Sequence, residues 1–269
     1  RRHFYQHAGF RYIASDAPIE TPDDRYETDP EVIPYCELHY GKEYFGVENY
    51  PEKLAQIALN HAQGSPKGKA LNIGCKTGRS AFELAVEFNS VIGVDFTARM
   101  IRIGVELKEK GYTQYTLPEE GEIVSFHQQN LQELGLDASR PKVEFLQSDI
   151  SNMKSLFTGY DLILLDTMLE NTYNPQKFLD NVHQRINSKG LLIIASSYDW
   201  QNDRTDREHW LGGFKINGEN ATTLNRLHEL LEDRFTRISE PTDIQQVIRK
   251  TNRTFEHKVI QVTVWKLNG

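Results

Sequence analysis

The chain has 269 residues, of which 38% are hydrophobic and 26% charged, and its net charge at pH 7 is −7. This length accommodates one large α/β domain, the acidic balance argues against a nucleic-acid-binding face, and no apolar run is long enough to span a membrane. Only two cysteines occur and the histidines form no metal-binding cluster, so we expect a cytoplasmic protein without a disulfide scaffold or a metal site.

The N-terminal part of the chain is irregular. The stretch "SDAPIETPDDRYETDPEVIP" is rich in proline and aspartate, which predicts a loop or linker. The aromatic stretch "VIPYCELHYGKEYFGVENYP" follows, and "YPEKLAQIALNHAQ" has the apolar spacing of an amphipathic helix.

From Lys69 onward, apolar strands alternate with helical stretches. We expect strands at 69–73, 90–94, 142–146, 160–166 and 190–196, and helices at about 78–88, 97–109, 126–135, 151–156 and 175–187. Strands that alternate with helices imply parallel crossovers. The fold class predicted is therefore α/β, with a doubly wound, mostly parallel sheet.

The C-terminal part breaks this alternation. After a helix at 220–233, two β-rich runs at about 243–250 and 256–266 predict an antiparallel pair. Between the second helix and the third strand, "GYTQYTLPEEGEIVSF" predicts a hairpin that turns at 118–121, and "HQQNLQELGLDASR" predicts a short helix. An alternating block that ends in an antiparallel strand is typical of Rossmann-like class I methyltransferases.

The stretch "ALNIGCKTGRS" predicts a buried strand, a glycine-containing turn and a helix. Gly74 and Gly78 let the backbone approach a ligand closely, although their spacing differs from the G-x-G-x-x-G of dinucleotide-binding folds. Asn72 stands where an acidic residue is usual, and Lys76 lies between the glycines. We expect Asn72 to keep the hydrogen bonds of that acid and the Lys76 side chain to extend toward solvent. Cofactor binding would then be weakened by on the order of 1 kcal/mol.

Three aspartates lie at the ends of later strands: Asp95 ends "VIGVD", Asp149 follows "VEFLQS", and Asp166 ends "YDLILLD". The carboxyl ends of parallel strands meet at the ligand-binding edge of such a sheet. A carboxylate at Asp95 can accept both ribose hydroxyls of an adenosine cofactor, one at Asp149 can accept the exocyclic amine of adenine, and Asp166 would lie beside the pocket. For each aspartate the alternative is a helix cap.

These features, in this order, resemble the pattern of methyltransferases that use S-adenosylmethionine. The segments "IGCKTGRSAFELA", "VIGVDFTARMI", "SSYDW", "REHWLGGF" and "VIRKTNRTFEHKVIQVTVWK" further resemble the C-terminal methyltransferase domain of the ovothiol-biosynthesis enzyme OvoA, over about residues 30–267. The resemblance implies that S-adenosylmethionine is converted to S-adenosylhomocysteine while the imidazole π nitrogen of 5-thiohistidine is methylated to give ovothiol A. The cofactor contacts that it implies are Asn72, Gly74, Cys75, Lys76, Gly78, Asp95, Phe96, Asp149, Ile150 and Asp166.

The resemblance also implies a longer protein. The stretch "RRHFYQHAGFRYI" resembles the end of the iron-dependent sulfoxide synthase domain that precedes the methyltransferase in that enzyme. We therefore expect a tail at 1–16, a linker at 17–30 and the methyltransferase domain at 31–269, covalently linked to a synthase domain. The alternative is an ordinary N-terminal extension of a free-standing enzyme.

Substrate contacts are expected after the fifth strand. Tyr198, Asp199 and Trp200 follow that strand, and Asp199 is either a catalytic group that holds the imidazole ring or the substrate ammonium, or a loop or helix cap. Trp210 and Phe214 flank two glycines. They form either a lid or a hydrophobic anchor against the sheet.

Two other segments supply expected substrate contacts. Arg249 suits a substrate carboxylate, because a guanidinium binds that group bidentately, or it is a surface arginine. Tyr35, His39, Tyr40 and Phe45 precede the first predicted helix, where aromatic faces stabilise a sulfonium, or they pack under the N-terminal cover. His39 is expected to be a proton acceptor.

Methylation of an imidazole nitrogen requires alignment and a dry pocket rather than a strong base, because the nitrogen lone pair is already nucleophilic. Two alternatives stay open: a catalytically silent S-adenosylmethionine-binding domain, which Asn72 and Lys76 suggest, and a methyltransferase for another small acceptor. The G-x-x-x-G spacing and the β-rich C-terminus argue against a nucleotide-dependent oxidoreductase.

Overall fold

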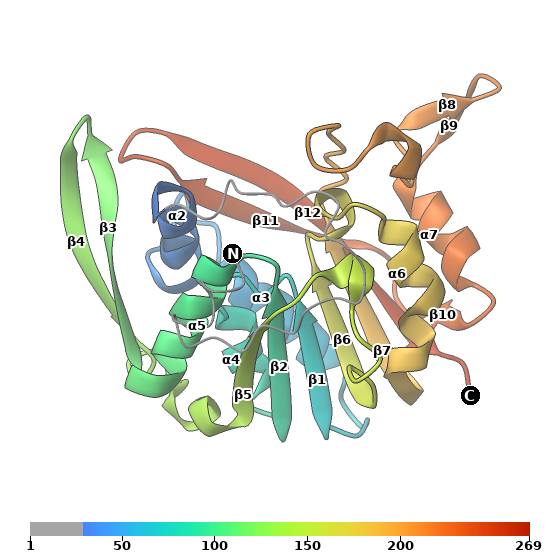
Figure 1. The fold of residues 1–269 in the computed structure, drawn as a ribbon, viewed down its shortest axis with the longest axis horizontal. Coiled ribbons are helices and arrows are strands. Elements are labelled where there is room, and N and C mark those ends of the chain that lie inside the picture. Colours follow the sequence, from blue (N-terminus) through green and yellow to red (C-terminus); the bar gives the residue numbers. More distant parts are fainter. Residues whose placement is uncertain (1–28) are drawn as a thin grey trace.

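A computed structural model describes residues 29–269. The expectations for the tail at 1–16 and for most of the linker at 17–30 lie outside these residues. The described chain forms an eight-stranded sheet of order β10-β12-β7-β6-β1-β2-β5, with β11 paired to β12 (Figure 1). No helix in the part of the chain described is long and apolar enough to cross a membrane.

Five strands of this sheet are parallel: β1 (Lys69–Ile73), β2 (Ser90–Asp95), β5 (Val143–Gln147), β6 (Tyr160–Asp166) and β7 (Ile186–Ser196). The antiparallel strands lie beyond β7: β10 (Phe235–Arg237), β11 (Thr242–Arg249) and β12 (Phe255–Leu267). The five predicted strands and the final antiparallel pair are confirmed, and so is the predicted α/β fold with a mostly parallel sheet.

Residues 29–269 contain six α-helices: α2 (Asp29–Tyr40), α3 (Tyr50–His61), α4 (Arg79–Leu84), α5 (Ala98–Lys110), α6 (Pro175–Asn181) and α7 (Thr223–Leu231). On one face of the sheet Leu54 and Phe82 pack into the same core as Leu164 of β6. On the other face Leu165 packs with Leu231. Because helices cover both faces, the central strands are apolar along nearly their whole length.

The connections contain short elements. In the part of the chain that the structure describes, 3₁₀ turns occur at η2 (Asp137–Lys142), η3 (Ile150–Asn152), η4 (Leu169–Asn171), η5 (Val182–Arg185) and η6 (Arg207–His209). Two hairpins stand outside the main sheet, one formed by β3 (Tyr112–Glu120) and β4 (Ile123–Asn130), the other by β8 (Phe214–Ile216) and β9 (Glu219–Ala221). In Figure 1 they project at opposite ends of the molecule.

Several predicted helices are wrong or too long. The helix at 126–135 is contradicted because residues 123–130 pair with β3 as the second strand of the predicted hairpin. The helices at 78–88, 151–156 and 175–187 shorten to α4, η3 and α6 followed by η5. The helix α2 was not predicted, since Pro34 lies inside it and proline in a helix interior usually ends or kinks the helix.

The helix α2 and the β11–β12 hairpin cover the carboxyl ends of the parallel strands, and the β3–β4 hairpin packs beside α2. The register pairs Gln261 of β12 with Ser196, the last residue of β7, so residues 255–260 extend beyond that strand and carry β11 with them. The helix α2 lies between β11 and the β3–β4 hairpin and contacts both (Figure 1). We refer to α2, the β11–β12 hairpin and the β3–β4 hairpin together as the roof.

Candidate cofactor and substrate site

The turn between β1 and α4 has a left-handed backbone. The φ angles of Gly74, Lys76 and Gly78 are 75°, 49° and 98°. A Cβ at position 74 would lie 2.5 Å from the carbonyl oxygen of Asp166, and a Cβ at position 78 would lie 2.5 Å from the Phe145 ring. Glycine is therefore required at these two positions because the backbone of the turn passes close to residues of β6 and β5, and not because it passes close to a ligand. Lys76 is not a glycine, and its left-handed backbone marks local strain of the kind that collects at functional sites.

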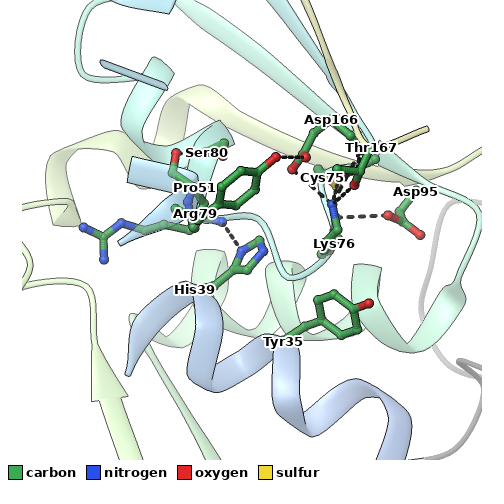
Figure 2. A network of polar contacts seen from close by, with 12 residues as sticks. Tyr35, His39, Pro51, Cys75, Lys76, Arg79, Ser80, Asp95, Asp166 and Thr167 are labelled. Atoms are coloured by element: carbon green, nitrogen blue, oxygen red, sulfur yellow. Dashed lines mark hydrogen bonds and ion pairs between the residues drawn. The ribbon is translucent and has the colours of Figure 1, made fainter. Parts of the chain in front are cut away.

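The Lys76 side chain points inward, contrary to the expectation that it extends toward solvent (Figure 2). Its Nζ lies 3.1 Å from Oδ2 of Asp166, and it donates to Oγ1 of Thr167 at 2.9 Å and to the carbonyl oxygen of Gly74 at 3.3 Å. The Asp166 side chain is only 1% exposed. A buried carboxylate requires a cation and hydrogen bonds, which explains why the lysine turns toward it.

The second oxygen of Asp166 is also occupied. The Tyr50 hydroxyl, on α3, donates to Oδ1 at 2.6 Å. Burial, followed by the nearby Asp166 charge, raises the pKa of Tyr50 well above its ordinary value, so the phenol stays protonated and donates. Asp166 therefore lies at the end of β6, as predicted, and is fixed by α3 on one side and by the Lys76 turn on the other.

Asp95 is oriented by two backbone groups. Its Oδ2 accepts the N–H of Lys76 at 3.0 Å, and its Oδ1 accepts the N–H of Thr97 at 2.9 Å. Burial raises the pKa of the Asp95 carboxyl, while these hydrogen bonds and the Lys76 charge oppose that rise. Each oxygen keeps a further lone pair, so the carboxylate remains able to accept two ribose hydroxyls.

Beside Asp95, the end of β5 carries a residue that the sequence analysis missed. Gln147 pairs with Asp95 in the parallel register, and its Nε2 donates to the carbonyl oxygen of Phe96 at 2.7 Å. Its Oε1 is buried and has no hydrogen-bond partner among residues 29–269. This orphaned acceptor, next to the half-buried Phe96, suits the amine of an adenine.

Asp149 and Ile150 have mainly structural roles. The carboxylate of Asp149 accepts the N–H of Ser151 at 2.8 Å, so the cap alternative is the one observed for this residue. Asn152 donates to its other oxygen at 3.0 Å. Ile150 is 5% exposed and packs into the core on the α6 face of the sheet.

Two expected contacts on β1 and its turn are buried. Neither amide atom of Asn72 has a partner within the described chain, so the hydrogen bonds expected from the missing acid are not made. The Cys75 thiol packs in the core at 1% exposure, and burial raises its pKa well above the ordinary value. The Cys75 side chain is therefore part of the core, and its expected contact with the cofactor stays a prediction. Its N–H is also used, donating to the carbonyl oxygen of Val94 at 3.1 Å.

The aromatic residues of α2 and the following loop divide into two groups. Tyr35 is half-buried, lies beside the Lys76 turn (Figure 2), and its carbonyl oxygen accepts the Thr77 hydroxyl at 3.3 Å. The buried Tyr40 donates to the carbonyl oxygen of Thr77 at 2.8 Å and fixes the turn. Phe45 is 72% exposed and packs on Phe255, with ring centroids 4.9 Å apart. Tyr40 is therefore engaged with the turn and Phe45 with the roof, and their substrate contacts stay predictions.

His39 lies under the turn in a form that cannot accept a proton as expected. Its Nδ1 accepts the backbone N–H of Arg79 at 3.2 Å, so the neutral ring carries its proton on Nε2. Burial, with the nearby charges of Lys76 and Arg79, holds the pKa of His39 well below its usual value. The Nε2 has no partner in residues 29–269 and is therefore a spare donor rather than a base.

The loop after β7 separates the two residues expected to act there. Tyr198 is half-buried, has a φ of 55°, and donates to Oε1 of Gln261 on β12 at 3.2 Å. Asp199 is exposed, accepts from Nε2 of Gln201 at 2.9 Å, and lies 3.8 Å from Arg204. Asp199 is thus engaged within its own loop, as in the alternative reading, while Tyr198 faces the roof.

Glu170 is a second residue that the sequence analysis missed. It is 1% exposed and accepts hydrogen bonds from the hydroxyls of Ser196 and Ser197, each at 2.7 Å. Its contacts with Ser196 and Ser197 place it at the end of β7, where its charge contributes to raising the pKa of both Tyr50 and Tyr198. Glu170 lies four residues after the end of β6, inside the 3₁₀ turn η4. The sequence pattern at the end of a strand does not predict a functional residue at that distance.

Two alternatives were open for the "WLGGF" segment, a lid and a hydrophobic anchor. The contacts of the segment are those of the anchor. Trp200 stacks on Trp210 at 6.2 Å, and its Nε1 donates to Oγ1 of Thr223 at 2.8 Å. The Arg207 guanidinium lies 4.9 Å from the Trp210 ring centroid and 4.5 Å from that of Phe214. These contacts pack the segment against α7 and explain its aromatic residues without a substrate.

Arg249 is 9% exposed and binds a carboxylate of the protein itself. Its Nη2 lies 2.7 Å from Oε1 of Glu119 at the tip of β3. Its Nη1 donates to the Tyr44 hydroxyl at 3.3 Å. Arg249 therefore binds a carboxylate, but that carboxylate belongs to Glu119 of the roof and not to a substrate. Arg249 is neither a surface arginine nor a free guanidinium.

The described residues contain no group of three or more His, Cys, Asp or Glu placed to hold a metal ion. They do bring together, at one edge of the sheet, Tyr35, His39, Tyr50, Lys76, Asp95, Gln147, Asp166, Glu170 and Tyr198. This set of oriented carboxylates, an orphaned amide oxygen and aromatic faces suits the adenosine part of an adenosyl cofactor.

Residues 65–250 match the family model described as a methyltransferase domain. No curated protein matches the sequence at a significant level. Among solved structures, the N-methyltransferase NodS from Bradyrhizobium japonicum WM9, in complex with S-adenosyl-L-homocysteine, is similar at 14% identity and a TM-score of 0.53, covering 90% of this chain and 100% of that chain.

Two further structures are similar at comparable levels. One comes from work on conversion of a disulfide bond into a thioacetal group during echinomycin biosynthesis, at 16% identity and a TM-score of 0.51, covering 80% of each chain. The other is the [4+2]-cyclase SpnF, at 12% identity and a TM-score of 0.51, covering 86% of this chain and 87% of that chain. At these identities the likenesses establish the fold.

Proposed function

We propose, from the premise that this chain belongs to the methyltransferase domain family, that it methylates the imidazole π nitrogen of 5-thiohistidine to give ovothiol A. The chain is a class I methyltransferase, and its cofactor is S-adenosylmethionine. The observation that carries the proposal is the strand-end cluster of Asp95, Lys76 and Asp166 under the roof, together with the sequence segments that resemble the thiohistidine methyltransferases.

The residues of the cluster fit the cofactor. S-adenosylmethionine supplies the methyl group as a sulfonium, and S-adenosylhomocysteine is left as product. Asp95 would accept the ribose hydroxyls, and Gln147 would accept the adenine amine. Tyr35, beside the turn, offers an aromatic face to a cationic donor.

The roof supports a small acceptor. The β11–β12 hairpin extends beyond the end of β7, and α2 lies against both hairpins of the roof, so the carboxyl edge of the sheet is covered. An amino-acid-sized acceptor fits beneath such a cover better than a folded macromolecule.

The groups near the end of β7 support an acceptor with both charge and hydrogen-bonding atoms. Glu170 accepts hydrogen bonds from Ser196 and Ser197 there, and Tyr198 is a protonated phenol. On the other side of the site, under the β1–α4 turn, His39 offers a spare N–H donor. These groups can position a zwitterionic imidazole. They supply no strong base, and none is needed, because the ring nitrogen already carries a lone pair.

The test is a mass-spectrometric assay with S-adenosylmethionine, in which 5-thiohistidine and histidine are offered in parallel. We expect methylation of 5-thiohistidine and little of histidine. Asp95→Ala is the matched control, since it removes the ribose acceptor and should abolish cofactor binding and turnover together. Cofactor binding by the unaltered protein without methylation of 5-thiohistidine would overturn the proposed substrate and favour a silent domain or another acceptor.

We also propose that the domain works in covalent linkage with an iron-dependent sulfoxide synthase domain, which would make the sulfur-bearing histidine. Support comes from the N-terminal sequence resemblance. The test is to search the genomic coding sequence upstream of Arg1 for that domain and to assay the complete protein for formation of the sulfur-bearing histidine. A coding sequence that begins at this chain would contradict the linkage.

A further inference from the structure

The order of the strands fixes the direction in which an adenosyl cofactor lies. Asp95 ends β2, which has β5 on one side and β1 followed by β6 on the other. The β5 side offers the Oε1 of Gln147, which has no partner among residues 29–269. The β1 and β6 side offers the carbonyl oxygen of Gly74 and the carboxylate of Asp166. With the ribose at Asp95, adenine therefore lies toward β5 and the amino-acid chain toward β1 and β6.

The α-ammonium of that amino-acid chain needs oxygen acceptors, and Lys76 already contacts three of those on this side. The Oδ1 of Asn72 has no partner among residues 29–269, but Asn72 is fully buried. Its Nζ contacts the carbonyl oxygen of Gly74 at 3.3 Å, Oδ2 of Asp166 at 3.1 Å and Oγ1 of Thr167 at 2.9 Å. An ammonium has three donors, so these contacts satisfy it. The remaining oxygen of Asp166 accepts from Tyr50 at 2.6 Å.

We propose that Lys76 is a specificity-determining residue of the cofactor site, whose own ammonium competes with the α-ammonium of the cofactor for Gly74 and Asp166. Two ammonium groups cannot share these acceptors, because like charges at such distances repel. Binding of the amino-acid half thus requires Lys76 to move away, and the site favours adenosyl thioethers that lack an α-ammonium. This inference rests on the proposed cofactor and not on the proposed acceptor.

The test measures binding by titration calorimetry and uses no methyl acceptor. The probes are S-adenosylhomocysteine, its analogue without the α-amino group, and 5′-methylthioadenosine, which lacks the amino-acid chain. Each is titrated into the unaltered protein and into Lys76→Met, which keeps side-chain length and removes the charge. Lys76→Gly is avoided, because glycine would also relax the left-handed backbone at this position, whose φ is 49°.

We expect Lys76→Met to bind S-adenosylhomocysteine about tenfold more tightly and 5′-methylthioadenosine within about twofold of the unaltered protein. We also expect the unaltered protein to bind the analogue without the amino group at least as tightly as S-adenosylhomocysteine. That comparison needs no variant, so it decides the question even if Lys76→Met fails to fold.

Weaker or unchanged binding of S-adenosylhomocysteine by Lys76→Met would overturn the competition, and weaker binding would instead make Lys76 a ligand of the cofactor carboxylate. A loss of about tenfold for the analogue without the amino group in the unaltered protein would overturn it as well. Failure of all three probes to bind would overturn the cofactor assignment and this inference together. Failure to methylate 5-thiohistidine, with the expected binding pattern, would leave the inference standing.

Discussion

Arg249 and Glu119 form an ion pair that joins the two hairpins of the roof, with 2.7 Å between Nη2 and Oε1. Arg249 also contacts the Tyr44 hydroxyl, which in turn donates to Glu37 of α2. The other oxygen of Glu37 accepts from Tyr115 of β3 at 2.7 Å. All three elements of the roof are therefore connected by one polar network that centres on the buried Glu37.

Arg249→Met should loosen the roof. Removal of the guanidinium leaves Glu119 without its cation and breaks the link to β11, so we expect faster amide hydrogen exchange along 112–130. Arg253→Met, an exposed arginine in the same β11–β12 connection, is the matched control and should leave that exchange unchanged. Unchanged exchange in Arg249→Met, with a raised KM for the acceptor, would instead support the substrate-carboxylate role that the sequence suggested.

The buried His39 should make stability depend on pH. Its folded-state pKa lies well below the ordinary 6.5, so below that pH the unfolded chain binds a proton that the folded chain does not. The contribution of His39 to the free energy of unfolding is therefore complete above about pH 6.5, and it falls by up to about 1.4 kcal/mol per pH unit below it.

Urea unfolding of the unaltered protein and of His39→Gln, measured from about pH 8 to pH 5, checks this expectation. Glutamine keeps an acceptor for the Arg79 N–H and does not titrate. The difference in the free energy of unfolding between the two proteins should shrink as the pH falls. A difference that stays constant over this range would mean that the imidazole titrates alike in the folded and unfolded chains.

Both thiols should resist modification in the folded protein. Cys36 and Cys75 are each 1% exposed, and burial raises the pKa of Cys75, so little thiolate forms and reagents cannot reach it. We expect a disulfide-exchange reagent to label neither thiol under native conditions and both in denaturant. Fast native labelling confined to Cys75 would show that the turn after β1 opens on its own.

Periodicity predicted the central sheet well, because its strands are buried on both faces and read as apolar runs such as the one that ends at Asp166. It failed at 126–135, where the pairing of β4 with β3 determines the conformation and the local composition does not. It also missed α2, whose interior Pro34 is tolerated because buried residues such as Cys36 and Tyr40 pack against the rest of the fold.

The site was predictable where it depends on strand ends. Asp95 and Asp166 lie where topology puts the carboxyl edge of the sheet, which sequence order alone indicates. The direction of the Lys76 side chain was not predictable, since it depends on a buried carboxylate ninety positions later in the chain. Gln147 and Glu170 were missed for a similar reason, because their burial and partners are properties of the folded chain.

Gly212 should be the least replaceable residue of the "WLGGF" segment. A Cβ at this position would lie 2.2 Å from the backbone nitrogen of Thr223, at the start of α7, and backbone cannot move away as a flexible side chain can. We expect Gly212→Ala to lower the free energy of unfolding by about 3 kcal/mol, through overpacking that displaces α7 and the stacked Trp200.

Gly218→Ala, in the β8–β9 hairpin, is the matched control. Its added Cβ meets no atom within 4 Å, and its φ of 89° adds only the backbone strain of a left-handed residue, about 1–2 kcal/mol. Urea unfolding, with tryptophan fluorescence as the signal, measures both variants. Equal losses for the two would mean that the segment moves away from α7 at little cost, and the lid alternative would then regain support over the anchor.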